Sequence, residues 1–174
     1  MKALRPLAVG WLVACTVSCA HRPNAVVTQW VLQNCRVGEQ DTLETKLRTE
    51  GKAAERGLIR YYGDGPGSST HAEIEAEAGR QFDEIIGALN AGRTYGLSGS
   101  EVDSIRADSR SEYIQAAVDD FDNGFRTATL KGLAVVGRPK GVKLLRRVAT
   151  DPSSSDRQVA IAALAAAGIP VTPP

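Results

Sequence analysis

Few residues in this chain could carry out chemistry, because it has only two histidines and three cysteines. His71 lies close to Glu73 and Glu75, a combination that can bind metal ions. A zinc ion, however, needs three or four ligands at suitable spacing, and the only other histidine is His21 near the N-terminus. The sequence therefore predicts no metal site.

Other candidate motifs are also better explained as structure. Asp119 and Asp120 are adjacent, so their side chains diverge around a helix instead of converging on one substrate. Residues 63–67, Gly-Asp-Gly-Pro-Gly, follow a predicted helix and lack the Lys-Ser/Thr ending of a phosphate loop. Cys35 has no histidine nearby, and we expect it to be a small buried hydrophobic residue. We predict no catalytic residue, no cofactor and no small-molecule substrate.

The first twenty residues have the pattern of an export signal. Lys2 and Arg5 precede an apolar run from Leu7 to Ala14, no acidic residue is present, and small residues and cysteines follow. The apolar run is shorter than the roughly 20 residues of a transmembrane helix. We expect residues 1–18 to direct export and then to be removed.

This segment resembles the signal of bacterial lipoproteins, in which a box of apolar and small residues precedes a cysteine. Two such boxes are present, Leu12-Val-Ala-Cys15 and Thr16-Val-Ser-Cys19. The resemblance implies that the cysteine is acylated and becomes the first residue of the mature protein. We expect acylation at Cys19, with Cys15 as the alternative, while cleavage after Ala20 would instead release a soluble protein.

Which cysteine is acylated also determines whether the remaining cysteines can form a disulfide. If it is Cys19, Cys35 is unpaired; if it is Cys15, then Cys19 and Cys35 could form a disulfide in an oxidising compartment. Two acyl chains would anchor the protein stably in a membrane. We expect a location in the cell envelope, at the outer membrane facing the periplasm in a Gram-negative cell.

Length and composition are typical of a single globular domain. The chain has 174 residues, of which 43% are hydrophobic, enough to build a core. Its net charge of +1 argues against nucleic acid as a partner, because nucleic-acid-binding domains are strongly basic.

A helical pattern recurs along the chain. Each copy is predicted to be a helix, a glycine at its C-terminus, a short turn, a second helix and a proline. A shift of 86 residues aligns residues 47–66 with 133–152, and a shift of 31 residues aligns part of the second copy with a truncated third. The matches include Leu47 with Leu133 and Leu164, Gly51 with Gly137 and Gly168, and Pro66 with Pro152. Repeats of this length indicate a stacked array.

The C-terminal copies resemble HEAT-like repeats of the phycobilisome-lyase type. The resemblance lies in Asp151-Pro152, residues 155–164 and Gly168-Ile-Pro170. It extends over residues 122–170 and more weakly over 40–66, and departs from the family at Ala160, where an arginine is usual. It implies an all-α fold, a short HEAT-like α-solenoid of antiparallel helical hairpins. Residues 39–170 would form this domain, 19–38 the anchor with a linker or capping segment, and 171–174 a tail.

Two longer central helices are predicted between the matching copies. The first begins at a capping box, Thr70 to Glu73, and ends at Gly92. Its inward face is formed by Ile74, Ala78, Phe82, Ile85 and Leu89. The second is predicted to begin at Ser100 and to end at Asn123-Gly124, with no sheet anywhere.

Charge is segregated along the chain, which hints at a partner. Residues 70–122 hold twelve acidic and four basic residues, and residues 123–174 hold two acidic and eight basic. One predicted helix carries a basic patch that could bind a partner or lipid headgroups: Lys140, Lys143, Arg146 and Arg147. The alternative is that these charges are solvated surface or compensate each other.

These observations favour an exported, lipid-anchored, non-catalytic protein-binding module whose partner is an unknown protein. The extended surface of stacked hairpins suits such a role. A structural component of an envelope assembly is the alternative. A lyase-type enzyme is implied only by the family name, and a fold does not transmit chemistry.

Overall fold

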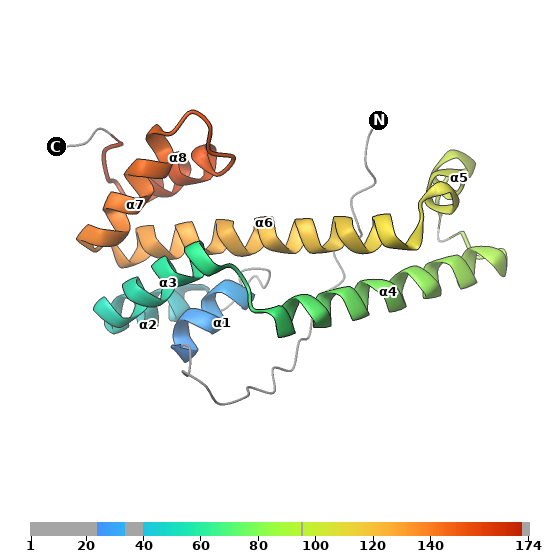
Figure 1. Ribbon diagram of the computed structural model, residues 1–174, viewed down its shortest axis with the longest axis horizontal. Helices are drawn as coiled ribbons and strands as arrows, with labels where there is room; N and C mark the ends of the chain where they lie inside the picture. Colours follow the sequence, from blue (N-terminus) through green and yellow to red (C-terminus); the bar gives the residue numbers. More distant parts are fainter. Residues whose placement is uncertain (1–23, 34–39, 95, 172–174) are drawn as a thin grey trace. The chain divides into compact units, whose positions relative to one another are not determined.

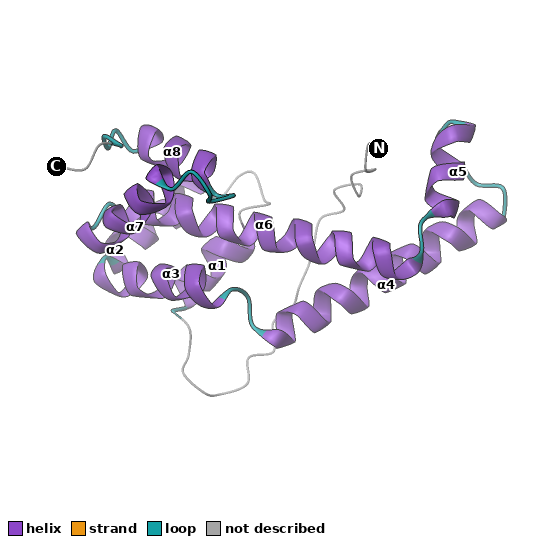
Figure 2. Ribbon diagram, turned by 45° about the horizontal axis from the view of Figure 1, so that its top comes forward, coloured by secondary structure: helices purple, strands orange, loops and turns teal. Residues whose placement is uncertain are grey.

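The computed structural model describes residues 24–33, 40–94 and 96–171, and it is drawn in Figure 1 and Figure 2. All regular secondary structure in these residues is helical and they contain no strand, which confirms the predicted all-α class. None of their helices is both long and apolar enough to cross a membrane. The helices are α1 (Ala25–Gln33), α2 (Gln40–Glu50), α3 (Lys52–Asp64), α4 (Ser68–Asn90), α5 (Gly99–Ala107), α6 (Arg110–Val136), α7 (Pro139–Thr150) and α8 (Arg157–Ala166).

The chain forms two compact units. Residues 66–123 hold twelve acidic and four basic residues, and we call them the acidic unit. Residues 24–65 and 124–171 together hold eight acidic and fourteen basic residues, and we call them the basic unit. Helix α6 contributes residues to both.

Leucines from several helices build the core of the basic unit. The fully buried ones are Leu47 on α2, Leu58 on α3, Leu130 and Leu133 on α6, Leu145 on α7 and Leu164 on α8. Trp30 on α1 is also buried, and its indole Nε1 donates a hydrogen bond to the carbonyl of Ala128 at 2.7 Å. The Trp30 side chain lies very close to helix α6 at Gly132: a Cβ added to this glycine would lie 2.6 Å from the indole nitrogen.

The residues matched by the two sequence shifts share a local geometry. Each of the three matched leucines is fully buried, and a glycine with a left-handed φ follows it four residues later. The φ values are 48° at Gly51, 64° at Gly137 and 67° at Gly168. Side chains rarely tolerate this conformation, which explains why glycine recurs where each helix ends.

The first predicted central helix is present in the acidic unit as α4. Gly92 has a φ of 77° just beyond its end, and Ile74, Ala78 and Leu89 are buried as expected. Phe82 is half-buried and packs against Tyr113 on α6, with ring centroids 5.5 Å apart. The predicted capping box at Thr70 is wrong: α4 begins at Ser68 after Gly67, with no side-chain cap.

The predicted second central helix is wrong in its start, continuity and end. Ser98, not Ser100, caps α5, and its side chain accepts a hydrogen bond from the backbone of Glu101. The helix then ends, and Ser109 caps the start of α6 through the same reciprocal hydrogen bonds with Glu112. Gly124 does not end α6. A glycine inside a helix is about 1 kcal/mol less favourable than alanine, and the burial of apolar side chains in the following turns of α6 offsets this loss.

Candidate functional site

Helix α7 carries the predicted basic patch, and the local sequence explains why the patch is exposed. Gly137 ends α6 and Pro139 occupies the first turn of α7, where a missing N–H costs nothing. Leu144, Leu145 and Val148 then turn inward. Steps of three and four residues place Lys140, Lys143 and Arg147 together on the outward side, and all three are exposed. We call these three residues the basic stripe.

Arg146 differs from the other residues of the predicted patch. Its side chain is half-buried, and its Nε donates a hydrogen bond to the carbonyl of Pro170 at 3.1 Å. It therefore holds the chain that follows α8 instead of extending the basic stripe.

A buried carboxylate fixes the start of α7. Glu55 on α3 is only 4% exposed, and its Oε1 accepts hydrogen bonds from the backbone N–H groups of Lys140 and Gly141, each at 2.9 Å. Its Oε2 lies 3.6 Å from Nε of Arg138. Two donors that a helix N-terminus leaves without partners are thus satisfied by a negative charge, which the helix dipole also favours.

Sequence reasoning missed the role of Glu55. Ala54 and Leu58 lie on the inward face of α3. A charged residue beside them on this face is a signal in the sequence, because a buried charge needs a partner. The second signal was the start of α7, where Arg138 supplies no side-chain cap. The sequence does not indicate that Glu55 caps α7, because Glu55 and Gly141 are 86 residues apart and only the tertiary fold brings them together.

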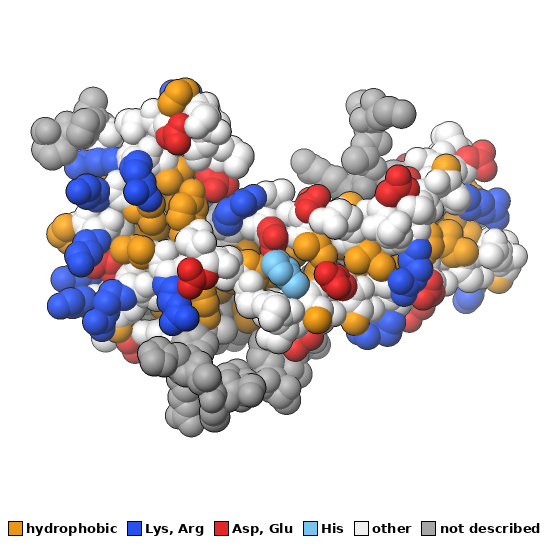
Figure 3. All heavy atoms as spheres, viewed as in Figure 1, with side chains coloured by type: hydrophobic (Ala, Val, Ile, Leu, Met, Phe, Trp, Pro, Cys, Tyr) orange, Lys and Arg blue, Asp and Glu red, His pale blue; other side chains and the backbone are white. Residues whose placement is uncertain are grey.

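Lys and Arg side chains gather at the end of the basic unit where α2, α3 and α7 lie, as Figure 3 shows. Helices α3 and α7 pack against each other, and α3 adds the exposed side chains of Lys52 and Arg56. Arg60 is also exposed on α3, but it is paired with Asp64 at 3.1 Å. The basic stripe is therefore part of a broader basic surface.

The acidic residues of the basic unit are mostly used inside the unit. Besides Glu55, five of them accept hydrogen bonds or form ion pairs: Glu44 with Arg48, Glu50 with Asn24, Asp64 with Arg60, Asp151 with Ser153, and Asp156 with Tyr62 and Arg126. Among the described residues of this unit, only Asp41 lacks a side-chain partner of this kind. Seven of the described basic side chains lack one: Lys46, Lys52, Arg56, Lys131, Lys140, Lys143 and Arg147. The available charge of this unit is therefore almost entirely positive.

A second polar cluster connects α3 with the start of α8. The hydroxyl of Tyr62 donates a hydrogen bond to Asp156 at 3.1 Å, and Nε of Arg126 lies 3.7 Å from the same carboxylate. Burial, and then the negative charge of Asp156, raise the pKa of Tyr62. The cluster joins three segments of the basic unit.

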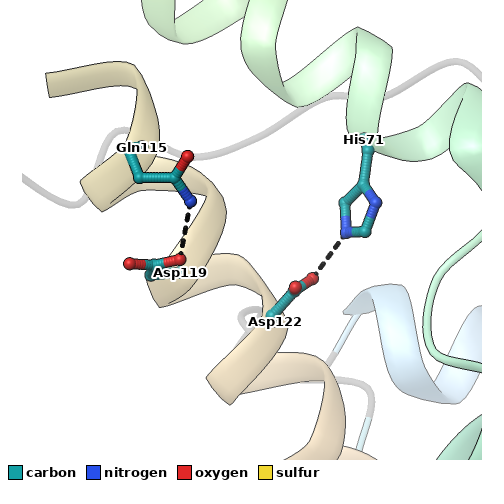
Figure 4. Close-up of polar contacts among 4 residues, drawn as sticks. All are labelled: His71, Gln115, Asp119 and Asp122. Atoms are coloured by element: carbon teal, nitrogen blue, oxygen red, sulfur yellow. Dashed lines mark hydrogen bonds and ion pairs between the residues drawn. The ribbon is translucent and has the colours of Figure 1, made fainter. Parts of the chain in front are cut away.

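His71 takes part in a pairwise contact. As Figure 4 shows, its ring points toward Asp122 on α6, with Nε2 and Oδ1 2.7 Å apart, while Asp119 accepts a hydrogen bond from Gln115. Glu73 and Glu75 are exposed and do not join this pair. No group of three or more His, Cys, Asp or Glu residues that could hold a metal ion occurs in the described part of the chain.

The predicted acylation site lies outside the described residues. This applies to Cys19, to its alternative Cys15, and to Cys35. Comparisons with protein-family models, curated proteins and solved structures found no match to this chain.

Proposed function

We propose that this chain is an exported, lipid-anchored protein of the cell envelope that binds another polypeptide without catalysis. Residues 1–18 would direct export, and Cys19, or Cys15 in its place, would carry the acyl chains. The cationic start, the apolar run and the small residues before each cysteine support this part of the proposal. Acylation would hold the protein at a membrane, where two chains are needed for stable anchoring.

Residues 39–170 would form a short HEAT-like solenoid of antiparallel hairpins. Two observations support this arrangement: a buried leucine precedes a left-handed glycine at three helix ends, and helices that follow one another in the chain pack together, α2 with α3 and α7 with α8. Stacked hairpins present extended surfaces that suit a polypeptide partner.

The main support for the binding role is that the cations of the basic stripe are free to bind a partner. Lys140, Lys143 and Arg147 are exposed on one side of α7, and their side chains form no hydrogen bond or ion pair with any described residue. The helix that carries them is fixed in position by Glu55. A row of unpaired cations on a fixed helix is complementary to an acidic polypeptide.

Intact mass of the membrane-extracted protein tests the anchor. We expect a diacylated or triacylated mass that begins at Cys19. A mass that begins at His21 without lipid would overturn the anchored location.

Photocrosslinking in intact cells tests the binding role. A photoreactive residue at position 140 should crosslink to a partner, whereas the same residue at exposed Ala165 on α8 should not. Reversal of Lys143 and Arg147 to glutamate should remove the crosslink at 140. Equal crosslinking at both positions, or crosslinking that survives the reversal, would contradict the proposal.

A further inference from the structure

The acidic unit uses its basic residues internally, as the basic unit uses its acidic ones. Arg80 is paired with Glu77, Arg110 with Asp83 at 3.1 Å, and Arg106 donates to the carbonyl of Leu89. Only Arg93 is exposed without a side-chain partner among the described residues of this unit.

The acidic residues that remain are numerous. Four more carboxylates are engaged with Ser98, Ser109, Gln115 or His71. Six are exposed and form no side-chain hydrogen bond or ion pair with a described residue: Glu73, Glu75, Glu84, Asp103, Asp108 and Asp120. The available charge of this unit is therefore almost entirely negative.

Among the residues that the structure describes, the available charges of the two units are thus opposite in sign and similar in number, with seven cations on the basic unit and six carboxylates on the acidic unit. Two basic units, or two acidic units, repel each other. A basic unit and an acidic unit attract, and two copies of one chain supply both. Internal pairing has already removed the minority charges that would weaken this attraction.

We propose that the polypeptide bound by the basic stripe is the acidic unit of a second copy of this chain. This inference rests on the proposed binding role of the stripe. The contact is head-to-tail, because different surfaces of the two copies meet, and repetition of such a contact closes a ring or continues as a filament. Exposed ion pairs are individually weak, so several must form together and the association must weaken with salt.

A second copy fits the charges better than a membrane surface does. An anionic bilayer would attract the basic unit but repel the acidic unit, which carries a surplus of eight negative charges: twelve acidic against four basic residues. A second copy is complementary to both units.

Zero-length carbodiimide coupling tests this directly, because it joins a lysine amine to a carboxylate only when the two are in contact. The purified full-length protein, in detergent, is mixed from unlabelled and ¹⁵N-labelled copies. We expect coupled peptides that join Lys140 or Lys143 of one isotope to residues 66–123 of the other. Coupling should fall about tenfold between roughly 0.05 M and 0.5 M salt, as screening removes the attraction.

Charge exchange provides the matched variants. K140E/K143E/R147E should lose the association of copies at low salt, and E73K/E84K should weaken it. A chain with both sets of reversals, or an equimolar mixture of the two variants, should associate again, because complementarity is restored with the signs exchanged. All five positions are exposed, and far-UV circular dichroism checks that each variant is folded.

The outcomes separate this inference from the proposed function. A protein that is monomeric at low salt, or whose association is not rescued by charge exchange, overturns the inference. If the crosslink from position 140 in cells then leads to a different protein and still needs the stripe, the proposed binding role stands alone. Salt-sensitive binding to vesicles of phosphatidylglycerol, with no coupling between copies, assigns the stripe to a membrane and also overturns the inference.

Discussion

The carboxylate of Glu55 on α3 lies 2.9 Å from the backbone nitrogen of Gly141 on α7, although 86 residues separate them. The same oxygen accepts the N–H of Lys140, so one side chain supplies the cap that α7 lacks locally. Removal of the carboxylate would leave the N–H of Gly141 unpaired in a buried position and that of Lys140 unpaired in a partly buried one.

Glu55→Ala should therefore destabilise the protein by about 2–4 kcal/mol. Glu55→Gln keeps one acceptor oxygen but loses the charge and the ion pair with Arg138, so its cost should be smaller than that of Glu55→Ala, about 1 kcal/mol. Urea unfolding measures both, with exposed Glu75→Ala as the matched control, expected within about 0.5 kcal/mol of the wild type. Equal stability of Glu55→Ala and Glu75→Ala would mean that the cap contributes nothing.

Two glycines of α6 should respond in opposite directions to the same substitution. A Cβ at Gly132 would lie 2.6 Å from Nε1 of Trp30 and 3.0 Å from Cδ2 of Leu58, so Gly132→Ala should cost about 1–3 kcal/mol. A Cβ at Gly124 meets nothing within 4 Å, so Gly124→Ala should stabilise the helix by about 0.5–1 kcal/mol. Thermal unfolding of the two variants should shift Tm down and up respectively; a tolerated Gly132→Ala would show that α1 and α3 do not approach α6 this closely.

The partial burial of Tyr62 beside Asp156 predicts a loss of stability at alkaline pH. The folded state raises the pKa of Tyr62, chiefly by burial, whereas the unfolded phenol titrates near 10. Above about pH 10 the unfolded state therefore binds fewer protons than the folded state, and the free energy of unfolding falls as pH rises. Tyr62→Phe should cost about 0.5–1.5 kcal/mol at pH 8, through the lost hydrogen bond. Urea unfolding from about pH 8 to 10.5 should show a shallower decline for this variant than for the wild type. Parallel declines would contradict this assignment.

The N-cap of α5 makes a prediction that NMR can test at one residue. Hydrogen bonds from the side chain and backbone of Ser98 lower the pKa of Glu101. Stability from this box is present above the ordinary carboxyl pKa and is lost as pH falls through the lowered value. In Ser98→Ala the carboxyl resonance of Glu101 should titrate at higher pH than in the wild type. Glu112 accepts the corresponding hydrogen bonds from Ser109 and serves as the control, because the pH at which its resonance titrates should not change.

Local patterns in the sequence predicted most of the helices, because their causes are local. Glycines such as Gly92 and Gly137 end helices through their own backbone geometry. The face formed by Ile74, Ala78 and Leu89 follows from helical spacing alone. The second central helix was mispredicted because its apolar spacing continues across Ser109, where a second capping box interrupts the backbone.

The candidate site was predictable only in part. The spacing of Lys140, Lys143 and Arg147 indicates one side of a helix, and all three are exposed. The same spacing includes Arg146, but its side chain donates a hydrogen bond to the carbonyl of Pro170. Such contacts between distant segments, like that of Glu55, depend on tertiary packing, which spacing along one helix does not encode.

The basic unit is assembled from two segments of the chain, and this constrains the order in which the protein can fold. Trp30 finds its acceptor on Ala128, 98 residues later. During synthesis, α1 to α3 are complete long before the leucines of α6 to α8 exist to cover Leu47 and Leu58. Because distant contacts form late and slowly, the first segment spends that interval with apolar surface uncovered, and it is the part of the chain most exposed to aggregation and most in need of a chaperone.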